Sequence, residues 1–162
     1  MACVICERYR GERPNERPIG GYVYQDDHWY AYHAPIAKAT LGQLFLVSTR
    51  HFLDYAEMTA DEAQSYGVVL RRLVAALKDV VQAERVYTLV TLEGIPHFHV
   101  WLIPRYRDQT ERGWSLITRE RSCSEADALA VVTQLREALA EEMLHFVQHD
   151  KRDGNQTGEN SL

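Results

Sequence analysis

The chain has 162 residues, of which 46% are hydrophobic and 25% are charged, and its formal net charge is -5. This composition is that of an ordinary globular protein, long enough to bury a core without disulfides. The acidic balance argues against general nucleic-acid binding, and no apolar run approaches the length of about 18 residues that a membrane span needs, so we also expect no signal peptide and a cytoplasmic location.

The N-terminus carries a C-x-x-C pair, Cys3 and Cys6. A disulfide scaffold is disfavoured because Cys123 is the one further cysteine, and a c-type haem site is disfavoured because Glu7 stands where a histidine is required. A thioredoxin-like pair should follow a strand, whereas this pair opens the sequence. Two interpretations remain: the cysteines are free and inert, or they form half of a zinc site that needs two more ligands from elsewhere in the chain.

The first half of the chain predicts an irregular segment followed by three strands. Residues 7–21 are rich in Arg, Glu, Pro and Gly and are expected to be irregular. Aromatic residues on both sides of an acidic turn predict a β-hairpin of strands 22–25 and 28–32. A loop at 34–39 then leads to a strand at 41–48, whose continuous apolar residues predict burial on both faces.

The second half predicts two helices and two further strands. Thr59 and Glu62 have capping-box spacing, and apolar residues at helical spacing extend that helix to about residue 83. Strands at 85–92 and 97–104, joined by a four-residue link, predict an antiparallel hairpin. A polar loop at 105–118 precedes a final amphipathic helix that Ser124 caps.

These elements predict an α+β class: an antiparallel meander sheet with one long central helix and a C-terminal helix. We expect a single domain over residues 1–149 and a disordered tail at 150–162, which is polar and contains Gly and Asn.

Two histidines in the last strand are the strongest functional signal. Alternation along a strand places His97, His99 and Trp101 on one face, and the apolar residues 98, 100 and 102 on the other. The apolar side predicts a core behind the strand, so the imidazoles project from a rigid element. The alternative is a pair of histidines on a solvated sheet face.

The segment Pro96-His-Phe-His-Val-Trp-Leu-Ile-Pro-Arg105 resembles the signature of the histidine-triad (HIT) family, in which three histidines alternate with apolar residues. The segment 44–52, which ends in a basic residue and His51, is similar to the strand that precedes the family's helix. The resemblance covers residues 3–107 and implies a HIT-like fold. It also implies action on nucleotide conjugates, such as dinucleoside polyphosphates and nucleoside phosphoramidates, through a covalent nucleotidyl-histidine.

The resemblance implies roles for particular residues. His99 stands at the position of the catalytic nucleophile, and a neutral imidazole suits that role at pH 7. Backbone N–H groups of Gly94 and Ile95 are expected to bind phosphate oxygens, although Gly94 is equally explained as a turn glycine. We also assign Trp101 to the nucleotide-binding site, with a role in the core or in stacking as the alternative.

A subset of the family that carries C-x-x-C binds structural zinc, and the resemblance carries those ligands over to Cys3, Cys6, His51 and His97. Two thiolates and two imidazoles form a closed tetrahedral set with no open position for a catalytic water. The alternative for His51 is a surface histidine at a strand end.

Two departures from the family pattern affect the functional prediction. Trp101 replaces the third signature histidine, and an indole has no titratable proton. The acidic residue that commonly binds the ribose hydroxyls is absent from Tyr32-His33-Ala34-Pro35, where His33 is a candidate replacement contact.

We therefore predict a nucleotide hydrolase or nucleotidyl transferase, with a non-catalytic nucleotide-binding or regulatory protein as the alternative. A zinc-dependent nucleic-acid module is disfavoured because the ligands are scattered and the chain is acidic. We expect a homodimer formed through Tyr66, Val69 and Leu73, unless this amphipathic stripe only covers the sheet.

Overall fold

A computed structural model describes residues 3–91 and 93–153, with residues 143–153 described by their backbone alone. Three short 3-10 helices, Pro14–Glu16, Ile36–Lys38 and Tyr55–Glu57, lie in the connections. The main elements, in chain order, are α1 (Val4–Tyr9), β1 (Tyr22–Gln25), β2 (Trp29–His33), β3 (Leu44–Ser48), α2 (Ala60–Val80), β4 (Arg85–Leu89), β5 (His99–Arg105), α3 (Trp114–Thr118) and α4 (Glu125–Asp153).

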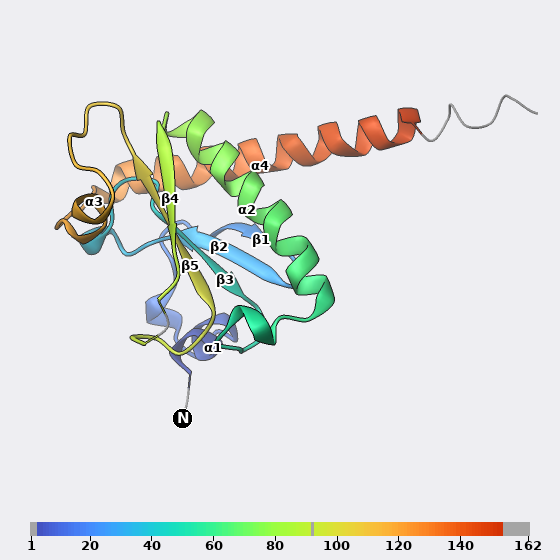
Figure 1. The fold of residues 1–162 in the computed structure, drawn as a ribbon, viewed down its shortest axis with the longest axis horizontal. Helices are drawn as coiled ribbons and strands as arrows, with labels where there is room; N and C mark the ends of the chain where they lie inside the picture. The colour runs from blue at the N-terminus through green and yellow to red at the C-terminus, as the bar shows by residue number, and fades with distance from the viewer. Residues whose placement is uncertain (1–2, 92, 154–162) are drawn as a thin grey trace, which may run out of the picture.

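The five strands form one antiparallel sheet in the order β1-β2-β3-β5-β4 (Figure 1). Helix α2 carries the chain from β3 to the far edge of the sheet, where β4 forms. Strand β5 then returns between β3 and β4, so the sheet departs from a simple meander at this one place. The expected α+β fold, with a long central helix and a C-terminal helix, is confirmed.

Helices α2 and α4 pack against one face of the sheet and enclose the main core. Val100 and Leu102 of β5, and Phe98 just before it, point into this core, as the alternation predicted from the sequence requires. Val69 and Leu73 of α2 are also buried in it. The expected dimer interface through Tyr66, Val69 and Leu73 is therefore wrong, because Val69 and Leu73 cover the domain's own sheet and Tyr66 packs, partly buried, against the same core. A homodimer stays a prediction without an assigned surface.

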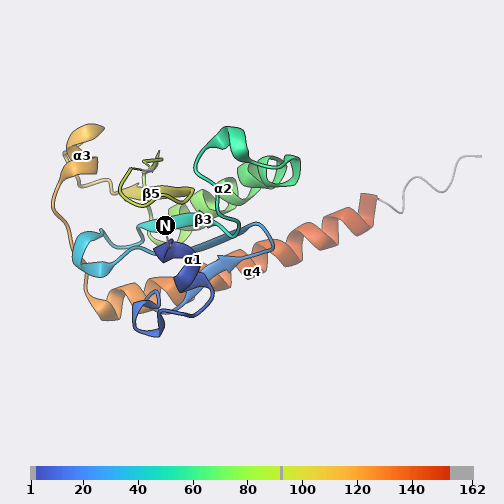
Figure 2. The same cartoon turned by 90° about the horizontal axis from the view of Figure 1, so that it is seen from below.

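The opposite face of the sheet carries α1 and a second, aromatic cluster. Ile5 of α1 packs against Tyr30 of β2 and Val47 of β3. The register pairs Tyr30 with Val47 and Val47 with His99. Helix α1 therefore packs on the row of the sheet that ends at His99. Figure 2 shows α1 on this face, away from α2.

Several boundaries differ from the sequence-based prediction. Helix α3 and the second half of α1, residues 7–9, lie in segments expected to be irregular. Strand β4 ends at Leu89 and β5 begins at His99, so the two strands lie further apart in the sequence than the four-residue link expected. Helix α4 continues to Asp153, past the boundary expected at residue 150, and the rest of the expected tail lies outside the described residues. No helix within the described ranges is both long and apolar enough to cross a membrane.

Candidate metal centre and adjacent histidine site

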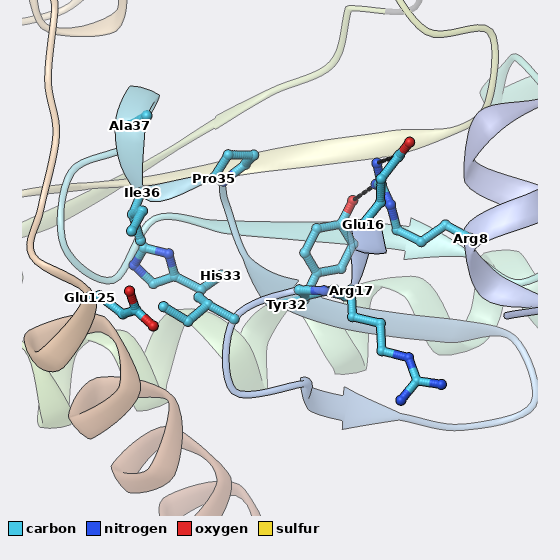
Figure 3. A pocket seen from close by; sticks show the side chains of 11 residues that line it. Arg8, Glu16, Arg17, Tyr32, His33, Pro35, Ile36, Ala37 and Glu125 are labelled. Carbon is cyan, nitrogen blue, oxygen red and sulfur yellow. Dashed lines mark hydrogen bonds and ion pairs between the residues drawn. The ribbon is translucent and has the colours of Figure 1, made fainter. Parts of the chain in front are cut away.

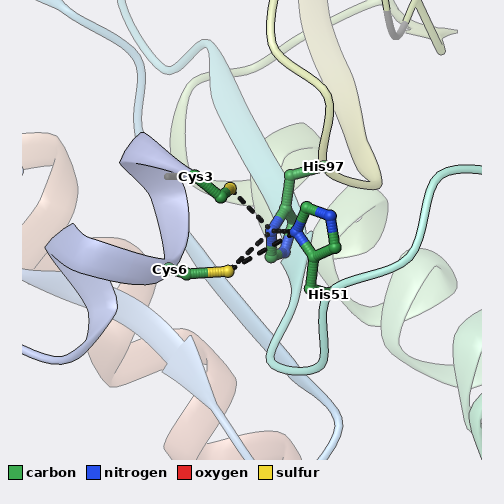
Figure 4. A group of neighbouring side chains, drawn as sticks. All are labelled: Cys3, Cys6, His51 and His97. Carbon is green, nitrogen blue, oxygen red and sulfur yellow. Dashed lines mark hydrogen bonds between the residues drawn. The ribbon is translucent and has the colours of Figure 1, made fainter. Parts of the chain in front are cut away.

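Four side chains from three separate segments converge beside the N-terminal end of β5. Cys3 precedes α1 and Cys6 lies in its first turns, so their thiols share one side of the helix (Figure 4). His51 follows β3 and His97 precedes β5. Their ligand atoms all lie within 4.8 Å of one another. The four residues that the sequence suggested as metal ligands are therefore brought together by the fold.

The distances within this cluster fit a tetrahedral zinc site. The Sγ atoms of Cys3 and Cys6 each lie 3.5 Å from His97 Nδ1, and Cys6 Sγ lies 3.5 Å from His51 Nδ1. The two Nδ1 atoms are 3.3 Å apart. Zinc bonds of about 2.3 Å to sulfur and about 2.0–2.1 Å to nitrogen, at tetrahedral angles, place S and N about 3.5–3.6 Å apart and two N atoms about 3.3–3.4 Å apart. The donor set and its spacing both match structural zinc.

The backbone prepares His97 as a ligand. Its Nε2 lies 2.8 Å from the carbonyl oxygen of Ser48, which accepts a hydrogen bond only from a protonated nitrogen. Nδ1 therefore keeps its lone pair for the metal, which is the usual arrangement of a ligating histidine. Burial lowers the pKa of His97 to about 4, so the ring is neutral at pH 7. Burial, together with the neighbouring Cys3, raises the pKa of the Cys6 thiol to about 11, so metal binding there displaces a proton.

Two buried phenylalanines hold the histidine ligands in place. Phe52 and Phe98, which follow His51 and His97 directly, stack with ring centroids 4.9 Å apart. The Phe98 N–H also donates to the Phe52 carbonyl at 2.7 Å. Both rings belong to the main core. Their packing therefore fixes the backbone that carries the neighbouring ligands His51 and His97.

An ion pair fixes the segment that carries His51. The Arg50 guanidinium donates two hydrogen bonds to Glu62, at 2.9 and 2.7 Å, and holds the pKa of this carboxyl at about 2. Glu62 also accepts from the N–H of Thr59 and so completes the predicted capping box of α2. The sequence revealed the cap but gave no signal for the pairing with Arg50.

His99 is the second prepared histidine, and it lies beside the metal cluster. Its side chain is 5% exposed, and its Nδ1 lies 2.7 Å from the carbonyl oxygen of His97. That carbonyl requires the proton to be on Nδ1, which leaves the Nε2 lone pair available. Burial lowers the pKa of His99, so the neutral form predominates at pH 7. An oriented, neutral imidazole on a strand is suited to act as a nucleophile.

Aromatic side chains form the wall next to His99. The Phe45 ring packs edge-on against His99 and against Trp101, with ring centroids 5.8 Å and 4.8 Å apart, respectively. Trp101 Nε1 is buried and has no hydrogen-bond partner among the described residues. The register aligns Tyr32, Phe45, Trp101 and Leu89 as one row across four strands.

A cavity of about 550 Å³ lies beyond this row (Figure 3). Tyr32 lies between the cavity and the aromatic wall next to His99. It forms part of the cavity wall, and its ring centroid lies 5.6 Å from that of Phe45. Arg8 donates to the Tyr32 hydroxyl at 3.3 Å and pairs with Glu16 at 3.0 Å. Arg17 and Glu125 also line the cavity, so its wall carries charges of both signs. No pattern in the sequence indicated this cavity, because residues between 8 and 19, which were expected to be an irregular surface segment, build much of it.

His33 lines the same cavity, but its nitrogens are engaged by the backbone. Nδ1 donates to the Ala34 carbonyl at 2.6 Å, and Nε2 accepts from the Gly42 N–H at 3.0 Å. Burial lowers the pKa of His33, so it stays neutral. The structure therefore gives His33 a role in holding the loop that follows β2, and it provides no free ring nitrogen for a ribose hydroxyl.

Gly94 and Ile95 lie exposed in the connection between β4 and β5. The Ile95 carbonyl accepts a hydrogen bond from the N–H of His97 at 2.8 Å. A Cβ atom on Gly94 would meet nothing within 4 Å, so packing within the chain does not require glycine there. Phosphate binding by these two N–H groups stays a prediction.

Comparison with solved structures shows that this fold is shared with histidine-triad proteins. A zinc-bound histidine triad family protein from Mycobacterium smegmatis matches 90% of this chain and 98% of its own, with a TM-score of 0.68 and 18% identity. A hypothetical histidine triad nucleotide-binding protein from Sulfolobus tokodaii matches 86% of this chain and 93% of its own, with a TM-score of 0.66 and 18% identity. A HIT family member from Bacillus subtilis matches 74% and 87%, with a TM-score of 0.56 and 21% identity. Neither a protein-family model nor a curated protein sequence matches the chain.

Proposed function

We propose that this chain, which has the histidine-triad fold, is a nucleotide hydrolase or nucleotidyl transferase that uses His99 as its nucleophile. The observation that carries the proposal is the hydrogen bond from His99 Nδ1 to the His97 carbonyl. It fixes the tautomer in which Nε2 is free to attack the α-phosphorus of a nucleotide conjugate. Attack forms a nucleotidyl-histidine and breaks the bond from phosphorus to the leaving group, and water or a second acceptor then releases the nucleotide.

The cavity beside Tyr32 supports nucleotide conjugates as the substrate class. Its volume of about 550 Å³ is within the range of small-molecule sites. A nucleoside bound there would extend past Phe45 toward His99. In this arrangement Trp101 lies beside the phosphates, and the N–H groups of Gly94 and Ile95 are the proposed donors to phosphate oxygens.

Zinc in this proposal is structural. It would be bound by a closed set of four ligands: Cys3, Cys6, His51 and His97. Zinc would then cross-link α1 to the two segments that carry His51 and His97. His97 would then hold the start of β5, and with it the carbonyl that orients His99. We expect the protein to act in the cytoplasm, where thiol ligands stay reduced.

A panel of nucleotide conjugates incubated with the wild type and with His99→Ala tests the proposal. We expect the wild type to cleave at least one dinucleoside polyphosphate or phosphoramidate, and His99→Ala to bind the same compound without cleaving it. Full turnover by His99→Ala would show that another group is the nucleophile.

The alternative is a nucleotide-binding or regulatory protein without catalysis, and Trp101 in place of the third histidine favours it. In that case the wild type binds nucleotides, measured by calorimetry, but releases no product from any member of the panel.

A further inference from the structure

Cys3 and Cys6 are placed so that a disulfide can form between them without movement of the backbone. Cys3 is the N-cap residue of α1 and Cys6 is the third residue of the helix, and Figure 4 shows both thiols directed to the same side. Cα atoms three residues apart in an α-helix are separated by about 5 Å, which lies inside the range of about 4.4–6.8 Å found for disulfides. The two sulfurs also belong to the group of four ligand atoms that lie within 4.8 Å of one another.

The cysteine pair is accessible to a small oxidant, because both residues are partly exposed. Zinc binding requires the two sulfurs to be thiolates, and the thiolate is the form that a peroxide oxidises. The sulfur atoms that would hold the metal are therefore also the atoms open to oxidation. Cys123, the third cysteine, lies outside this cluster.

Helix α1 connects the cysteine pair to the cavity beside Tyr32. Arg8, two residues after Cys6, donates to the Tyr32 hydroxyl at 3.3 Å and pairs with Glu16 at 3.0 Å, and all three of these residues line the cavity. A helix of six residues is too short to be stable alone, so the position of α1 depends on its tertiary contacts. The position of this cavity wall therefore depends on what anchors α1.

His97 connects the same pair to His99. The Nδ1 atom of His97 lies 3.5 Å from each of the two sulfurs, and its carbonyl oxygen lies 2.7 Å from His99 Nδ1. The metal cluster therefore joins the helix that carries Arg8 to the residue that orients His99. Loss of the two sulfur ligands would separate these two parts of the site.

We propose that Cys3 and Cys6 form a reversible oxidation site, at which hydrogen peroxide converts the thiolate pair to a disulfide, zinc is released and α1 is uncoupled from His97. One thiolate sulfur attacks a peroxide oxygen and becomes a sulfenic acid, while the O–O bond breaks and the departing hydroxide takes up a proton. The second thiolate attacks that sulfur, the S–O bond breaks, and a second hydroxide leaves and is protonated. Two electrons pass from the sulfurs to the peroxide, so two thiolates, one hydrogen peroxide and two protons give one disulfide and two waters.

The disulfide removes both anionic ligands from the cluster. Its sulfurs carry no negative charge, and His51 and His97 alone should not retain zinc. The main core does not include α1, so the domain should stay folded while α1 and the start of β5 lose their cross-link. A dithiol reductant regenerates the thiolates by exchange and so restores zinc binding. The oxidation site does not depend on the proposed function, whereas its effect on turnover does.

Titration of the zinc-loaded full chain with hydrogen peroxide tests the proposal. A chromophoric chelator reports released zinc, digestion without reductant and mass spectrometry map the disulfides, and amide hydrogen exchange reports the order of residues 4–9 and 96–101. We expect about one zinc released for each Cys3–Cys6 disulfide, and faster exchange in both segments. The kcat/KM for a cleavable dinucleoside polyphosphate should fall by about 10–100-fold, the usual cost of removing support from a site residue. Dithiothreitol and added zinc should reverse all of these changes.

Two variants assign the effect to the cysteine pair. Cys123→Ser is the matched control, because it removes a cysteine outside the cluster, and it should respond to peroxide as the wild type does. The double variant Cys3→Ser/Cys6→Ser should lack zinc from the start and show fast exchange at residues 96–101 without any oxidant. Peroxide should then cause no further change in that segment.

The outcomes separate this proposal from the proposed function. Zinc that stays bound in excess peroxide overturns it, as does zinc release without a Cys3–Cys6 disulfide. A Cys3–Cys6 disulfide that leaves exchange at residues 96–101 unchanged overturns the coupling to His99. If the protein cleaves none of the nucleotide conjugates, the proposed function fails, but zinc release, the disulfide map and hydrogen exchange still decide whether the oxidation site exists.

Discussion

Removing the two cysteine ligands, Cys3 just before α1 and Cys6 within it, is expected to release the metal and destabilise the protein without unfolding it. In the double variant Cys3→Ser/Cys6→Ser, two hydroxyls replace the thiolates, and the two histidines alone should not retain zinc. The main core lies between the sheet and helices α2 and α4, and α1 is not part of it. The domain should therefore remain folded while α1 loses its anchor.

The magnitude follows from what α1 buries. Ile5 is 3% exposed and packs against Tyr30 and Val47. Full burial of an isoleucine is worth about 1.5–3 kcal/mol. A change of 1 kcal/mol shifts Tm by about 2–4 °C in a domain of this size, so detachment of α1 should lower Tm by about 3–12 °C.

Elemental analysis and a thermal melt of the same samples check this prediction. The wild type should carry about one zinc per chain and the double variant none. Cys123→Ser is the matched control, because this cysteine lies outside the metal cluster, and it should keep both the zinc and the Tm. Retention of zinc by the double variant, or loss of zinc with no change in Tm, would contradict this role of the cysteines.

Further predictions concern the histidines, the ion pair at Arg50 and assembly. His97→Ala should lose zinc and stability, and its activity should fall as a consequence. His99→Ala should keep its zinc and its Tm. Loss of zinc from both variants to the same extent would contradict their separate roles. Glu62→Gln should lower stability by about 1.5 kcal/mol at pH 7, as expected for a hydrogen bond to a charged group. Because Arg50 lowers the folded-state pKa of Glu62 to about 2, this contribution is complete above the ordinary carboxyl pKa and is lost as the pH falls toward 2. The difference in Tm between wild type and Glu62→Gln should therefore shrink between pH 5 and pH 2, and a constant difference would contradict the pairing. Light scattering at micromolar concentration should give a dimer mass, and a monomer mass would end that expectation.

The sequence predicted those parts of the site that depend on local pattern. Alternation along one strand placed His99 and Trp101 on one face and Phe98 in the core, and the structure confirms this arrangement. The capping box at Thr59 correctly located the start of α2. These features need only the periodicity of a strand or helix, which is encoded within a few residues.

The parts that sequence reasoning missed depend on contacts between distant segments. Helix α1 has six residues, too few to be stable alone, and it forms where Ile5 meets the sheet. The cavity beside Tyr32 is closed by the segment that follows α1, whose irregular sequence carries no periodic signal. The helical stripe at Val69 and Leu73 showed which residues are apolar, but it could not show whether a sheet or a second chain covers them.

The most direct test of the account is detection of the covalent intermediate on His99. The protein is mixed with a cleavable dinucleoside polyphosphate, quenched with alkali within milliseconds to seconds, digested and mapped by mass spectrometry. We expect a nucleoside monophosphate on the peptide that contains His99, and its absence from His99→Ala treated in the same way. An adduct on another residue, or turnover of the wild type with no phosphorus–nitrogen adduct at any quench time, would contradict it.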